Sequence, residues 1–229
     1  MDDSSCGQGG NGYYPESTMH WLEKQLQEAE KKGQMRVVLS HYSLLSDYGT
    51  GYQIDNPGLK ALLEKYRVQL FFSGHQHTQN ILAENDLHEV ISASALALPC
   101  LAGRLSVHED HISYRAEPLD FETYGPEGFA DTVRLTAEES EKSRNELFAG
   151  IIEQHISDPE ERKQTLDLIS LVLTSVSEGS LHENYERICR DPAYDMMNES
   201  LAQTNYGPWI AGMLKEKPAD VSALELERK

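Results

Sequence analysis

The sequence predicts an α/β fold with a mixed sheet, followed by a small all-α subdomain. In the first half, two short apolar runs each follow a helical pattern, and two hairpin patterns come after them. The second half shows apolar residues at helical spacing. We therefore predict an α/β domain over residues 1–124, a helical subdomain over residues 125–215 and a charged flexible tail over residues 216–229.

The first helix is expected over residues 15–32, where apolar side chains recur on one face, and Gly33 is expected to end it. Residues 36–40 have the sequence RVVLS, a short apolar run with β-branched side chains. Such a run is typical of a strand that is buried on both faces. A loop rich in Gly, Ser, Asp and Tyr follows over residues 42–56.

The second helix is expected to begin at Asn56 and Pro57, which suit the cap and first-turn positions, and to run to about Tyr66. A second buried strand, VQLFFS, is expected over residues 68–73. Gly74 follows it and is expected to let the backbone turn tightly where the strand ends.

Two β-hairpins are expected next, turning at residues 84–86 and 109–110. In the second half, the sequence TAEE from Thr136 forms a capping box, which predicts a helix start there. Asp158, directly before a proline, predicts the start of the following helix.

The composition excludes several classes of function. Lys and Arg number 20 against 38 Asp and Glu, so the net charge is −18. This charge argues against nucleic acid as a partner, and against anionic membrane surfaces. The chain has no apolar run of the roughly 18–20 residues that span a bilayer, and its polar start does not resemble a signal peptide. Three widely spaced cysteines indicate a reducing compartment, so we predict a cytoplasmic protein.

Histidines follow both predicted buried strands. His41 comes directly after the first strand, and His75 and His77 follow the second. Because ligand chemistry in open α/β sheets sits beyond the carboxyl ends of strands, we expect His41 to lie within reach of the His75/His77 pair. Imidazole nitrogens bind divalent transition metals. The spacing of His75 and His77 points their rings apart, so the sequence predicts a metal site in which these two serve different ions.

The run HYSLL from His41, the helix from Asn56 and the run FFSGHQH ending at His77 together resemble the C-terminal half of a calcineurin-like metallophosphoesterase. The preceding helix around Trp21 resembles one that this family often places before its fourth motif. The resemblance covers residues 14–120 and implies a partial domain of this family, a layered α/β sandwich with a mixed sheet.

The resemblance also implies a hydrolase of phosphoester bonds with two divalent metal ions, which share a water molecule and lower its pKa. His41 and His75 match ligands of the second metal, and His77 matches a ligand of the first. Mn, Fe, Zn and Ni remain open as metals, as do phosphomonoesters and phosphodiesters as substrates. The acidic composition favours a small phosphoester over a polyanion.

Other motifs of the family are missing before His41. We find no Asp-x-His, Gly-Asp or Gly-Asn-His sequence there, and Asn11 is followed by Gly12 where the last motif needs a histidine. No catalytic residue can therefore be identified. We expect the chain to be a truncated portion of a longer enzyme, to bind metal weakly and to lack phosphatase activity alone.

Two alternatives stay open for the function. One is a non-catalytic interaction module that retains the phosphoesterase fold, and the other is a mononuclear metal-binding protein that uses the three histidines for another purpose. If the family's first half is absent, one apolar face of the sheet lacks its cover. We expect a homodimer, the missing half or the helical subdomain to cover it.

Overall fold

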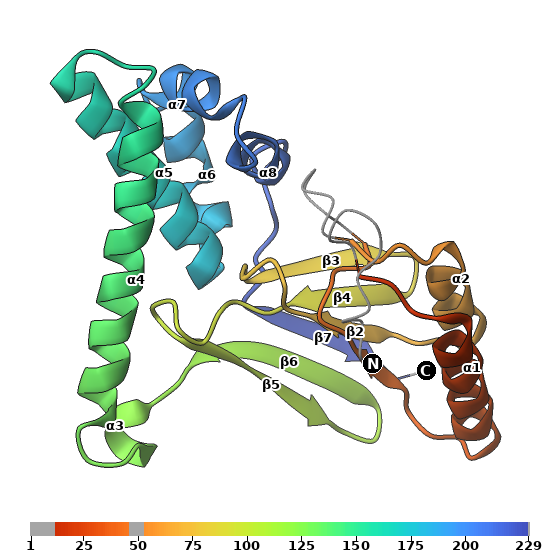
Figure 1. The fold of residues 1–229 in the computed structure, drawn as a ribbon. Helices are drawn as coiled ribbons and strands as arrows, with labels where there is room; N and C mark the ends of the chain where they lie inside the picture. The colour runs from red at the N-terminus through yellow and green to blue at the C-terminus, as the bar shows by residue number, and fades with distance from the viewer. Residues whose placement is uncertain (1–11, 46–52, 229) are drawn as a thin grey trace.

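The fold is known from a computed structural model that describes residues 12–45 and 53–228 (Figure 1). Its first part is a four-stranded mixed sheet in the order β1-β2-β4-β3. Strands β1, β2 and β4 run parallel, and β3 pairs antiparallel with β4, which confirms the mixed sheet and the first predicted hairpin. The strands are β1 (Val37–Leu39), β2 (Leu70–Ser73), β3 (Asn80–Glu84) and β4 (Leu87–Ile91).

Two helices, α1 (Glu16–Lys31) and α2 (Pro57–Lys65), pack on one face of this sheet. Leu22 and Leu26 of α1 and Leu59 and Leu63 of α2 are buried in one apolar cluster, together with Phe71 at the centre of β2. Helix α1 lies where the apolar periodicity predicts it, and α2 begins at the cap and first-turn residues that predict it, Asn56 and Pro57.

A second sheet, antiparallel and three-stranded, packs against the opposite face. It consists of β5 (Leu101–Val107), β6 (His111–Pro118) and β7 (Ala223–Glu227) in that order. Side chains alternate between the faces of a strand, so Phe72 points away from the helices, and its ring centroid lies 5.8 Å from that of Tyr114 on β6. This second sheet therefore covers part of the apolar face of the first sheet, the face that was expected to lack a cover. Leu39 of β1, an edge strand of the first sheet, is 61% exposed.

The predicted flexible tail over residues 216–229 is wrong for Ala223–Glu227, because these residues form β7. Leu224 and Leu226 are half-buried, while the residues on either side of each are exposed. This alternation is typical of a strand that covers a core with one face. A hydrogen bond from Gln69 Nε2 to the Glu227 carbonyl oxygen, 2.8 Å long, also ties β7 to the first sheet. The sequence did not predict this strand, because it has only five residues and three of them are acidic or small. Such a segment is hard to distinguish from a charged tail.

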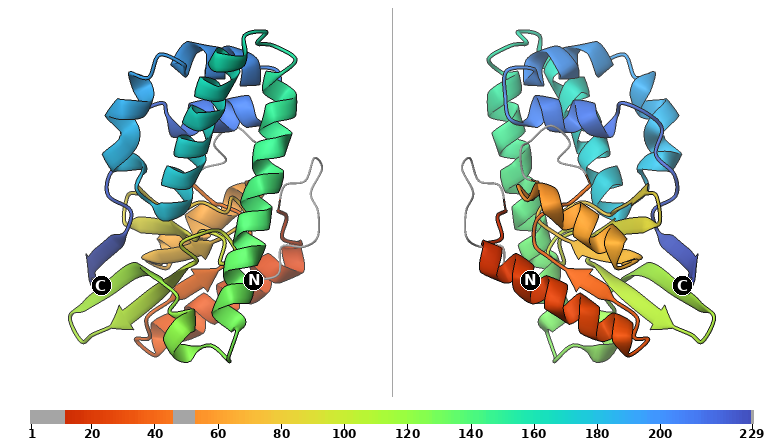
Figure 2. Two further views of the ribbon diagram at one scale, coloured as in Figure 1. Left: turned by 90° about the vertical axis from the view of Figure 1, so that its left-hand side faces the viewer. Right: turned by 90° about the vertical axis from the view of Figure 1, so that its right-hand side faces the viewer.

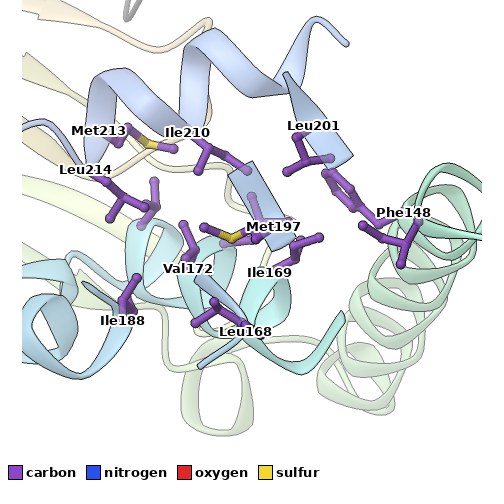
Figure 3. Packing of buried hydrophobic residues seen from close by; sticks show 14 of the residues in the cluster. Phe148, Leu168, Ile169, Val172, Ile188, Met197, Leu201, Ile210, Met213 and Leu214 are labelled. Atoms are coloured by element: carbon purple, nitrogen blue, oxygen red, sulfur yellow. The ribbon is translucent and has the colours of Figure 1, made fainter. Parts of the chain in front are cut away.

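The second half of the chain is helical and has its own core. Its helices are α3 (Phe121–Tyr124), α4 (Phe129–Ile152), α5 (Pro159–Glu178), α6 (Leu181–Cys189), α7 (Tyr194–Leu201) and α8 (Tyr206–Met213). Figure 3 shows buried side chains of this core, among them Phe148 of α4, Val172 of α5 and Met197 of α7. Helix α4 extends from the side of the β5–β6 hairpin to α7 (Figure 2). No helix in the described part of the chain is both long and apolar enough to cross a membrane.

The helix starts agree with the sequence at one position and differ at another. Asp158 Oδ1 accepts hydrogen bonds from the backbone N–H groups of Glu160 and Glu161, so it caps α5 as predicted. Helix α4 instead begins at Phe129, one turn and more before the expected start at Thr136. Thr136 lies inside the helix, and its hydroxyl donates a hydrogen bond to a carbonyl oxygen one turn earlier. A threonine that bonds in this way can occupy a helix interior instead of a cap.

Candidate functional site

His41 and His75 lie side by side at the carboxyl ends of β1 and β2. The parallel pairing continues past the strands, because Ser40 N–H donates to the Phe72 carbonyl oxygen over 2.9 Å. The carbonyl oxygen of His41 then accepts from the backbone N–H groups of Gly74 (3.0 Å) and His75 (2.8 Å). The backbone therefore fixes the two histidines next to each other, as the order of the strands predicts.

The two imidazole rings are in direct contact. His75 Nδ1 lies 2.8 Å from His41 Nε2, a hydrogen-bond distance at which one nitrogen donates and the other accepts. Two nitrogens bound to one zinc ion at ~2.1 Å in tetrahedral geometry stand roughly 3.4 Å apart, so a small separation of the rings admits one ion. The ring of Tyr42 packs against His75 with centroids 4.4 Å apart and limits how far that ring can turn.

His77 does not join this pair. Its backbone is left-handed, with φ of 54°, its N–H donates to the Gly74 carbonyl oxygen over 3.0 Å, and its side chain is exposed. Within residues 12–45 and 53–228, no three His, Cys, Asp or Glu side chains are grouped so that they could hold a metal ion together. The dinuclear set that the resemblance implies does not fit the described residues, and we derive no catalytic step through it.

The tight turn after β2 runs from Gly74 to His77, and the residue with the left-handed backbone in it is His77. Gly74 has no left-handed backbone, and a Cβ atom built on it meets no heavy atom within 4 Å. Gly179, which ends α5, has φ of 73°, and a Cβ there would stand 2.9 Å from Gln79 Cγ. The structural need for glycine is therefore at Gly179.

These two glycines give a matched prediction. We expect Gly179→Ala to lower the free energy of unfolding by about 1 kcal/mol or more, because alanine is strained at positive φ and meets Gln79. Gly74→Ala should change it by less than about 0.5 kcal/mol, since the site is open. Urea unfolding of both variants measures the difference, and equal losses would refute this assignment.

The family comparison covers the segment that carries the three histidines. Residues 3–79 match the calcineurin-like phosphoesterase family. The match includes both strand ends and stops directly before β3, so it confirms the family resemblance; that only the C-terminal half of the family's domain is present stays a prediction. No curated protein matches the chain.

The sequence analysis missed Glu89 on β4, a residue that contacts the family-matched segment. Its side chain is fully buried, and its carboxylate accepts from the N–H groups of Leu44 (3.0 Å) and Leu45 (2.6 Å) and from Ser73 Oγ (2.6 Å). Burial, the largest influence, raises the pKa of Glu89, while these donors lower it. A glutamate between apolar residues of the strand sequence LHEVI is the signal that could have identified it, because charged side chains are rarely buried without partners.

Glu89 and Asn56 together hold the segment around His41. Glu89 binds the backbone three and four residues after His41, and Ser73 lies two residues before His75. Asn56 occupies the cap position of α2 as predicted, but its side chain binds Tyr14 instead, accepting from its N–H and donating to its carbonyl oxygen. The Tyr14 hydroxyl in turn lies 2.6 Å from Ser40 Oγ. Contacts from Glu89 and from Tyr14 thus hold the two strand ends that carry His41 and His75.

Proposed function

We propose that this chain carries the histidine portion of a metal-dependent phosphoester hydrolase, and that His41 and His75 hold one divalent ion. The observation that carries this proposal is the direct contact of the two rings at adjacent parallel strand ends, inside the segment that matches the phosphoesterase family. An ion held there would neutralise charge on a phosphate group and lower the pKa of a bound water molecule. His77 lies outside this proposed site, because the described residues place no third ligand beside the pair.

The substrate is proposed to be a small phosphoester, and the metal to be Mn, Fe, Zn or Ni. A chain with a net charge of −18 repels polyanionic substrates at long range, whereas a small ester carries little charge to repel. Imidazole ligands accept any of these four metals, and their availability decides between them. A cytoplasmic location and the absence of nucleic-acid and membrane partners remain part of the proposal.

A second candidate is a metal-binding or interaction module without catalysis. It is favoured by the lack of a third ligand beside the His41–His75 pair in the part of the chain that the structure describes. The missing Asp-x-His, Gly-Asp and Gly-Asn-His sequences point the same way.

The metal proposal predicts that His41→Ala and His75→Ala each weaken zinc binding by about tenfold or more, because each removes one of two ligands. Isothermal titration of the wild-type chain and both variants with Zn²⁺ measures this. His108→Ala is the matched control, because His108 and His111 form another close ring pair, 4.2 Å between centroids, outside the family match. An effect of His108→Ala equal to that of His41→Ala would contradict the assignment.

A hydrolysis assay can exclude the second candidate. For the 229-residue chain with added Mn²⁺ or Zn²⁺, we expect no hydrolysis of p-nitrophenyl phosphate above the rate of the metal alone, because the bridging ligands are missing from the sequence. A clear rate above that background that His41→Ala abolishes would contradict this expectation and exclude the non-catalytic module.

A further inference from the structure

A pocket of about 260 Å³ lies between the end of β2 and the helical part of the chain. His77 and Thr78 line it from the segment after β2, Ser94 from the loop after β4, and Arg144 and Trp209 from α4 and α8. It therefore joins the family-matched segment to the helices of the second half. Its volume is close to the lower end of the range for pockets that bind small molecules.

The pocket carries positive charge in an acidic protein. Arg144 lines it, and none of the residues that line it in the described part of the chain is Asp or Glu. The nearest ion pair of Arg144, to Glu141 one turn earlier on α4, is long at 3.7 Å. A guanidinium without a close carboxylate is suited to bind a phosphate through two parallel hydrogen bonds.

Among the polar atoms of the pocket residues, Arg144 Nε and Thr78 Oγ1 are buried without a hydrogen-bond partner among the residues described. The Thr78 residue is only 2% exposed. Buried polar groups are almost always hydrogen-bonded, so two such donors at one pocket indicate a missing acceptor. A phosphate oxygen is an acceptor that both groups can use.

The pocket is also lined by an aromatic side chain, Trp209. Arg144 and Trp209 also line a neighbouring pocket, together with Leu147, Phe148 and Tyr206, so an apolar region continues beyond the arginine. An indole ring beside an arginine offers a stacking surface for a planar group. The arrangement pairs a place for a phosphate with a place for a ring.

We propose that Arg144, Thr78 and Trp209 bind the substrate, and that the substrate is a phosphoester of a small aromatic alcohol. Arg144 and Thr78 hold the phosphate on the side of His77, and Trp209 stacks on the ring. The helical half thus supplies two of the three residues that bind the ester. This inference rests on the proposed function for its choice of a phosphoester.

Phenyl phosphate is a suitable probe, and Trp209 can report its binding. The chain has two tryptophans, and Trp21 on α1 is 53% exposed, so Trp21→Phe leaves Trp209 as the only indole. In this background we expect phenyl phosphate to change the fluorescence with saturation at millimolar concentrations. Inorganic phosphate should bind more weakly and change the fluorescence less, because it has no ring. The titration is done with EDTA, so it does not depend on metal or turnover.

Arg144→Gln in the same background should weaken phenyl phosphate binding by about tenfold to a hundredfold, the range for hydrogen bonds to a charged group. Arg144→Lys keeps the charge but loses the paired hydrogen-bond geometry. Its affinity for phenyl phosphate should lie between those of the parent and of Arg144→Gln. Arg134→Gln is the matched control, because Arg134 is an exposed arginine of α4 that pairs with Asp131 and Glu138. Circular dichroism checks that all variants are folded.

The inference is overturned if phenyl phosphate leaves Trp209 fluorescence unchanged, if Arg144→Gln binds as tightly as the parent, or if inorganic phosphate produces the same signal. Failure of the proposed function has a different signature: phenyl phosphate binds in EDTA, yet Zn²⁺ binding does not depend on His41 or His75.

Discussion

Glu89→Ala is expected to lower the free energy of unfolding by about 3 kcal/mol or more. The substitution leaves four donors in the interior without this acceptor, the N–H groups of Leu44 and Leu45 and the hydroxyls of Ser43 and Ser73. Each unsatisfied buried group costs about 1–3 kcal/mol, and relief of the carboxylate's own burial offsets part of the sum. Urea unfolding followed by circular dichroism measures the loss.

Glu89 also gives the stability a defined dependence on pH. Because burial raises the pKa of Glu89 above its ordinary value of 4.5, the folded state holds the proton more tightly than the unfolded state. The resulting stabilisation is fully present below pH 4.5 and is lost as the pH rises through the raised pKa. Glu89→Gln cannot titrate, so its unfolding free energy should lack this decline while remaining below that of the wild type at neutral pH.

Glu84→Gln provides the control for both experiments. Glu84 lies at the exposed end of β3 and pairs with Lys60 at the surface, so its replacement should cost less than about 1 kcal/mol. If Glu89→Ala costs no more than Glu84→Gln, or if Glu89→Gln keeps the full pH dependence of the wild type, then Glu89 does not hold the segment after His41 as described.

Phe148→Ala is expected to cost about 3–5 kcal/mol, the usual range for removing a buried aromatic ring. Phe148 is 2% exposed in the core of the helical half, and its ring centroid lies 4.9 Å from that of Tyr206 on α8. The cavity would loosen the packing of α4 on α8, the helices that carry Arg144 and Trp209. Thermal and urea unfolding of the variant measure the cost.

The neighbouring residue supplies the control. Leu147 is 47% exposed on the same helix, so Leu147→Ala should cost well under half as much as Phe148→Ala. Comparable losses for the two variants would mean that α4 does not pack on the helical core through Phe148.

Much of the fold could be predicted from the sequence because its signals are local. The apolar runs of β1 and β2, the periodicity of α1, the Asn56-Pro57 start of α2 and the cap at Asp158 each depend on a few adjacent residues. The position of β7 could not be predicted, because its alternation is short and its partner β6 lies about a hundred residues earlier. The start of α4 at Phe129 was hidden by a capping box that the folded chain does not use.

The candidate site, like the fold, was predicted only in part. That His41 and His75 meet follows from the two strands being parallel neighbours, which the sequence pattern indicates. That His77 turns away depends on its left-handed backbone, which no sequence pattern indicates for a histidine. The contacts of Glu89 join β4 to a loop more than forty residues away, and no local pattern reveals such a partner.

The central claim is that His41 and His75 together hold one divalent ion. The most direct test is a Zn²⁺ titration followed by NMR of the histidine ring nitrogens, with His41→Ala and His75→Ala used to assign the signals. We expect the resonances of His41 Nε2 and His75 Nδ1 to shift in parallel at the same zinc concentrations, while those of His108 and His111 stay unchanged. A shift of only one of the two, or an equal shift of His108 and His111, would contradict the claim.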